Sequence, residues 1–119
     1  MKLNEIIKKI KSKSKERTLR NAYSFVTNHF SNEKYNLILK FPKQFKKINN
    51  KLFEKKQFAN CTLQNKILIK LLTETGQFTE KDFKKKRQVK YFGHQYLISR
   101  INNKKFIVDC FLRKFARKE

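Results

Sequence analysis

The sequence predicts one α+β domain, with N-terminal helices, a central helix and a small antiparallel sheet that ends in a C-terminal hairpin. Three observations lead to this prediction. Apolar residues recur at helical spacing in the first and middle parts of the chain, alternating apolar residues fill positions 89–112, and 119 residues are too few for two hydrophobic cores. Hydrophobic residues make up 39% of the chain, so residues 1–119 can bury a single core.

The N-terminal part predicts two helices. Leu3, Ile6, Ile7 and Ile10 have the i, i+3, i+4, i+7 spacing of one helix face. After the polar stretch KSKSKER, a second apolar stripe begins at Leu19 and predicts a helix to about residue 32. Alternating residues 35–41 before Pro42 then predict a strand, and residues 45–53 predict one or two short basic helical turns.

The middle of the chain gives the strongest helix signal. Asn60 is a good N-cap, apolar residues follow at helical spacing over 61–75, and Gly76 suits the C-terminal cap. Thr79 and Asp82 have capping-box spacing, which predicts a second, short basic helix over 79–88.

The C-terminal part predicts a hairpin. Two runs rich in β-branched and aromatic residues, 89–101 and 104–112, flank Asn102-Asn103, and asparagine tolerates the positive φ of a tight turn. The tail 111–119 is predicted either as a helix or as a frayed end.

The charge indicates a polyanionic partner. The chain has 31 basic against 9 acidic residues and a net charge of +22. The excess lies in four blocks, 1–20, 33–56, 81–90 and 100–119, while the segment 57–80 is neutral. A/T-rich codons could raise the lysine content, but they would supply glutamate as well, and acidic residues are scarce.

We therefore expect a small nucleic-acid-binding protein that contacts the phosphate backbone, with RNA favoured over DNA, such as a ribosomal protein or another ribonucleoprotein component. Lysine greatly outnumbers arginine, which favours phosphate contacts over bidentate reading of bases. Aromatic residues between the basic ones could stack on unpaired bases. The basic residues expected to bind form two patches: Lys8, Lys9, Lys11, Lys13 and Arg17, and Lys84, Lys85, Lys86 and Arg87.

A winged-helix-like DNA-binding protein is one of two alternatives. The sequence has the element order of such a domain: the helix over 61–75, the turn at Gly76, the predicted basic helix over 79–88 and the hairpin. The basic helix would then contact DNA and the hairpin would form the wing.

Another alternative is a cysteine enzyme. Cys61 would lie in the first turn of the central helix, where the helix dipole stabilises a thiolate. His94 would begin one strand of the hairpin and Asp109 would end the next, so the hairpin could bring them together. A cysteine nucleophile, a histidine base and a carboxylate form the triad of acyl-transfer enzymes.

Here residues 57–112 resemble the transglutaminase-like, or papain-like, cysteine enzymes. The segments NCTLQNKILIKLLTETG and GHQYLISRINNKKFIVD carry the resemblance. It implies a hydrolase or acyltransferase with Cys61 as nucleophile, His94 as base and Asp109 as the orienting carboxylate. Gln57 would lend an amide to the oxyanion hole beside the Cys61 N–H.

The remaining patterns suggest little else. Two cysteines and two histidines lack metal-ligand spacing, so we expect no metal and no cofactor. No segment has the length and hydropathy of a membrane span, and the first residues lack the features of a secretory signal. We expect a reducing compartment, the cytoplasm or an organellar matrix. The amino-acid sequence does not indicate an oligomeric state.

Overall fold

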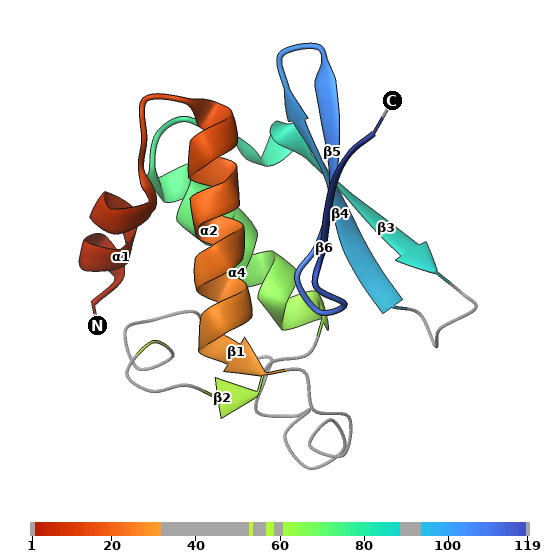
Figure 1. Cartoon of the computed structure of the whole chain (residues 1–119), viewed down its shortest axis with the longest axis horizontal. Coiled ribbons are helices and arrows are strands. Elements are labelled where there is room, and N and C mark those ends of the chain that lie inside the picture. Colours follow the sequence, from red (N-terminus) through yellow and green to blue (C-terminus); the bar gives the residue numbers. More distant parts are fainter. Residues whose placement is uncertain (1, 32–52, 54–56, 59–60, 89–93, 119) are drawn as a thin grey trace.

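A computed structural model gives the structure of residues 2–31, 53, 57–58, 61–88 and 94–118. It confirms the α+β class: within these residues, three α-helices precede a four-stranded antiparallel sheet (Figure 1). The strand expected at 35–41, the turns expected at 45–53 other than Phe53, and the Asn60 cap lie outside the described residues.

The two N-terminal helices follow the apolar stripes. Helix α1 spans Leu3–Ile10 and buries Ile6 and Ile10. Helix α2 spans Lys15–His29. It begins earlier than its apolar stripe because the Ser14 side chain caps it, accepting a hydrogen bond from the Arg17 N–H at 3.3 Å.

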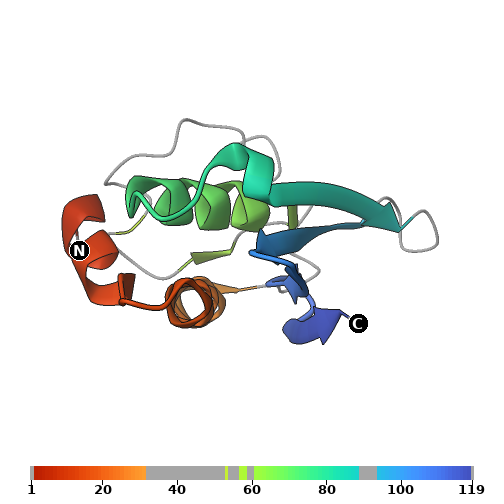
Figure 2. The same cartoon turned by 90° about the horizontal axis from the view of Figure 1, so that it is seen from above.

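The neutral central segment forms helix α4, Cys61–Glu74, as predicted. It packs against both α2 and β4 and runs in the opposite sense to α2 (Figures 1 and 2). Its central place explains why its polar residues Gln64 and Asn65 are buried together with its leucines. The helix is followed by Gly76, whose φ of +81° suits the residue without a Cβ. Two short strands, β1 at Phe30–Ser31 and β2 at Gln57–Phe58, pair in parallel beside the lower end of α2.

The sheet has the strand order β3-β4-β5-β6 with every neighbouring pair antiparallel. The strands are β3 (Phe83–Gln88), β4 (His94–Ile101), β5 (Lys104–Asp109) and β6 (Lys114–Lys118). The predicted β4–β5 hairpin is present, and Asn102 adopts a positive φ of 56° in its turn. Strands β3 and β6 are the two edges of the sheet.

The helix predicted over 79–88 is wrong. The capping interaction exists, since the Asp82 carboxylate accepts a hydrogen bond from the Thr79 N–H at 2.9 Å, but it starts only a 3-10 turn, Glu80–Asp82. Residues 83–88 form β3 and pair along their whole length with β4. Phe83 is the one large apolar residue in 83–88, so a helix formed by this segment would bury little apolar surface. Pairing with β4 therefore prevails over the local helix propensity. The basic helix that a winged-helix interpretation requires is therefore absent.

The prediction for the C-terminal tail is also wrong, because most of it forms the edge strand β6. The chain reverses after β5 with Arg113 at a positive φ of 59°. Strand β6 then pairs with β5, and the Phe115 ring lies 5.2 Å from Tyr23 of α2 and 5.9 Å from Phe106 of β5. This aromatic packing holds the strand that sequence periodicity did not indicate.

The core lies between the helices and one face of the sheet, here called the inner face. Leu97, Phe106 and Val108 point from this face into the same buried cluster as α4 residues Ile67 and Leu71. In Figure 2, β3 is at about the same height as α4, and β6 is at about the same height as α2. Both helices therefore face the same side of the sheet. Among the described residues, no helix lies over the opposite face, which we call the outer face (Figure 1).

Candidate nucleic-acid interface

The outer face carries an apolar centre with basic side chains around it. The strand registers set Lys84 opposite Ile98 and Ile98 opposite Ile107, while Lys86 is opposite Tyr96. Because side chains alternate between faces, these residues share the face that points away from the helices. Ile98 is only 9% exposed even here, whereas Lys84 is exposed and Lys86 is half-buried. The combination offers apolar contact area next to ammonium groups.

Two positive charges face each other directly on this surface. Arg100 of β4 is the register partner of Lys105 of β5, and both side chains are exposed. Like charges directly opposite each other across a sheet destabilise the pairing. Together with Lys84, Lys86 and Ile98 they line a hollow of about 340 Å³, here called the outer hollow. An anion bound between them would relieve the repulsion.

The described carboxylates do little to neutralise this surface. Asp82 is the one carboxylate among the residues that line the outer hollow, against the five cations Lys81, Lys84, Lys86, Arg100 and Lys105. Asp109, at the end of β5, is 4% exposed and accepts a hydrogen bond from the Leu112 N–H at 3.0 Å. The outer hollow therefore keeps a strong excess of positive charge.

The two basic patches predicted from the sequence are exposed, except for the half-buried Lys86, and they are separate. The first patch lies at the opposite end of the molecule from β3 (Figure 1), with Lys8 and Lys9 on α1, Lys11 and Lys13 between the helices, and Arg17 at the start of α2. The side chains of the run Lys84–Arg87 are shared between the two faces of the sheet. Lys84 and Lys86 belong to the outer face, and Lys85 and Arg87 belong to the inner face. The two patches do not form a common surface.

Sequence reasoning missed several residues of the outer face. Arg100, Lys105, Ile98, Ile107 and Tyr96 join the β3 lysines only through the strand register. The alternation of residues in 96–100 and 104–108 was visible in the sequence, but the partnership with β3 was not, because that segment was predicted to be a helix.

Of the proposed catalytic residues, the structure brings Cys61 close to the start of β4, where His94 lies. Cys61 is the first residue of α4, and its Sγ accepts a hydrogen bond from the Gln95 N–H at 3.4 Å. His94 directly precedes Gln95 at the start of β4. The β4–β5 ladder ends at Leu97 and Val108, one residue before Asp109 on β5. The side chains of His94 and Gln57 lie outside the described residues.

A buried amide pair fixes this end of β4 against α4. The Asn65 Nδ2 donates hydrogen bonds to both the carbonyl O and the Oε1 of Gln95, at 3.0 and 3.1 Å. Both residues are almost fully buried. The contact of Cys61 with β4 is thus supported by a neighbouring pair of hydrogen bonds, one helical turn further along α4.

The two thiols differ in environment. Cys61 is half-buried at the helix start and Cys110 is buried after β5, and both are free thiols. Burial, with a smaller contribution from the Asp109 charge, raises the pKa of Cys110 to about 12.

In the described part of the chain, no three His, Cys, Asp or Glu side chains gather as metal ligands would. No helix among those described has the length and apolar character needed to cross a membrane.

No protein-family model matches this chain, and no curated protein or solved structure matches it significantly.

Proposed function

We propose that this protein binds nucleic acid, RNA in preference to DNA, through the outer face of its sheet. The observation that carries the proposal is the Arg100–Lys105 pair, in which two exposed cations face each other beside an apolar centre. A phosphate placed between them would be attracted by both side chains and would release counterions. Tyr96 and Ile107, both half-buried, provide apolar area on which unpaired bases can pack.

Reversal of one charge tests this surface without unfolding it. Lys105→Glu would place a carboxylate opposite Arg100 and replace a repulsive pair with an attractive one, so we expect the fold to become more stable. The same change should weaken RNA binding and lower the slope of log K against log salt by about 0.7 for each phosphate that the variant no longer binds. Fluorescence anisotropy of a labelled RNA of about 12 nucleotides over a salt series measures both quantities.

Lys8→Glu on α1 is the matched control, because it makes the same charge change at the far end of the molecule. We expect it to weaken binding less than Lys105→Glu does. Undetectable RNA affinity of the unmodified protein at low salt, or equal effects of the two variants, would contradict the proposal.

We propose a cysteine hydrolase or acyltransferase as the second candidate, because Cys61 contacts the strand residue that follows His94. A histidine base beside the thiol would activate it as a nucleophile. Iodoacetamide should then alkylate Cys61 faster than the buried Cys110, and His94→Gln should slow the reaction of Cys61. Equal and slow labelling of both cysteines, or an unchanged rate for Cys61 in His94→Gln, would exclude this candidate.

A further inference from the structure

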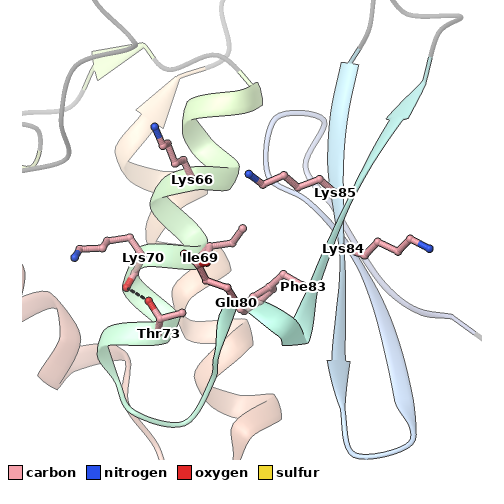
Figure 3. Close-up of a pocket in the computed structure, with 8 residues that line it drawn as sticks. All are labelled: Lys66, Ile69, Lys70, Thr73, Glu80, Phe83, Lys84 and Lys85. Atoms are coloured by element: carbon pink, nitrogen blue, oxygen red, sulfur yellow. Dashed lines mark hydrogen bonds between the residues drawn. The ribbon is translucent and has the colours of Figure 1, made fainter.

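A second basic hollow lies on the other side of β3, between that strand and α4 (Figure 3). We call it the inner groove. It has a volume of about 610 Å³, and Lys66, Ile69 and Lys70 line it from α4 while Phe83 and Lys85 line it from β3. Figure 3 shows Lys85 pointing toward the α4 side of the strand and Lys84 pointing the other way. The floor is apolar and the walls carry ammonium groups.

The inner groove and the outer hollow meet at the edge of the sheet. Phe83 and Lys84 line both of them, one from each side of β3. Because β3 is an edge strand in the described sheet, none of the described strands separates the two along this side. A flexible chain lying in the outer hollow can therefore continue around the edge into the inner groove.

The charges of the inner groove are not all available to a ligand. Lys70 forms an ion pair with Glu74 at 2.7 Å, one helical turn along α4. Lys66 and Lys85 take part in none of the ion pairs found among the described residues, which are Arg20–Glu16 and Lys70–Glu74. Glu80 is the carboxylate among the residues that line the groove. Lys66 on α4 and Lys85 on β3 are therefore lining lysines outside these ion pairs, and Lys85 points toward α4 (Figure 3).

We infer that a single-stranded nucleic acid, rather than a duplex, crosses the β3 edge from the outer hollow into the inner groove, with phosphates on Lys66 and Lys85. This inference rests on the proposed function, since it extends the same binding surface. A duplex has a persistence length of about 50 nm and cannot bend around one strand of a sheet. A single strand can turn there, place its phosphates on the lysines and pack bases against Phe83 and Ile69.

The experiment compares three charge-reversal variants with the unmodified protein on two probes. The double variant Lys66→Glu/Lys85→Glu removes the cations of the inner groove, Lys105→Glu reverses one cation of the outer hollow, and Lys8→Glu/Lys9→Glu makes the same double charge change on α1. The probes are a labelled single strand of about 12 nucleotides and a duplex of the same sequence. Anisotropy titrations over a salt series give the affinity and its salt slope.

We expect the unmodified protein to bind the single strand more tightly than the duplex. The inner-groove variant should bind the single strand about tenfold more weakly, with a slope lower by about 1.4, as expected when two phosphates are no longer neutralised by the protein. The α1 variant should retain more of its affinity. Thermal melting shows that each variant is folded, and Lys66→Gln/Lys85→Gln gives the same comparison without new negative charge.

The outcomes separate the two proposals. If Lys105→Glu weakens binding but the inner-groove variants do not, or if the duplex binds as tightly as the single strand, the track around the β3 edge is rejected while the outer face stands. If the unmodified protein binds neither probe at low salt, the proposed function itself fails, and the inference fails with it.

Discussion

The guanidinium of Arg113 donates a hydrogen bond to the backbone carbonyl of Phe30 at 2.8 Å, across 83 residues of sequence. The same guanidinium donates to the carbonyl of Cys110 and to the Gln64 Oε1. One side chain in the β5–β6 turn therefore connects the end of α2, the central helix and the last hairpin. It does so from a residue whose φ is positive, a conformation that costs a non-glycine residue about 1 kcal/mol or more.

Replacement of Arg113 should therefore have two separable effects. Arg113→Ala removes the hydrogen bonds and keeps the positive φ, so we expect the free energy of unfolding to fall by about 2–3 kcal/mol. Arg113→Gly removes the same bonds but accepts that φ at no steric cost, and it should be about 1 kcal/mol more stable than Arg113→Ala. Urea denaturation of the three proteins measures the difference. Equal stability of Arg113→Ala and the unmodified protein would show that the guanidinium contacts contribute nothing.

The Asn65–Gln95 pair should be costly to break. Asn65→Ala leaves the buried carbonyl O and Oε1 of Gln95 without their donor, so we expect a loss of about 1–3 kcal/mol in unfolding free energy. Thr62→Ala, one turn away from the pair on a half-buried position, is the control and should cost much less. Chemical denaturation tests both variants, and equal losses would contradict a specific role for the amide pair.

Replacement of Ser99 by alanine should stabilise the protein. Its Oγ is fully buried on the inner face and has no hydrogen-bond partner among the described residues. A buried hydroxyl without a partner costs about 1–3 kcal/mol, so Ser99→Ala should raise the thermal midpoint. The exposed Ser24→Ala is the control and should leave the midpoint nearly unchanged. A lower midpoint for Ser99→Ala would mean that the hydroxyl has a stabilising role in the core.

Cys110 should make the protein less stable as the solution becomes alkaline. Its thiol has a pKa raised from 9.0 to about 12, so between those values the unfolded chain loses this proton and the folded chain keeps it. The unfolded state then binds fewer protons, and the free energy of unfolding falls by up to about 1.4 kcal/mol per pH unit from this group. Below pH 9 the group contributes no slope.

Cys110→Ala isolates that contribution from the other groups that titrate at high pH. The stability difference between the unmodified protein and Cys110→Ala should be constant at neutral pH and shrink above pH 9. Urea midpoints from pH 7 to 10.5 measure it. A difference that stays constant over this range would contradict the raised pKa.

Sequence periodicity was sufficient for elements whose own residues bury a face. Helix α1 matches its four-residue apolar stripe, α4 matches the neutral segment between its basic neighbours, and the β4–β5 hairpin matches the turn at Asn102. In each case the information lies in residues close in sequence.

The two incorrect elements depend on contacts that are distant in sequence. Strand β3 reads FKKKRQ, a composition compatible with a helix, and only its pairing with β4 makes it a strand. Strand β6 needs the reversal at Arg113 and the contact between Phe115 and Tyr23. The candidate site was predicted only in part for the same reason. The lysines of β3 were found by their charge, but Arg100, Lys105 and Lys66 join them only in the folded chain.

The open edges of the sheet also limit how the molecule meets its own copies. Strand β3 presents a run of lysines and an arginine along one edge, and β6 presents Lys114 and Arg117 along the other. A second copy that tried to extend the sheet at either edge would bring these charges together in rows about 5 Å apart. This repulsion would oppose extension of the described four-stranded sheet by another copy, and high salt would weaken it.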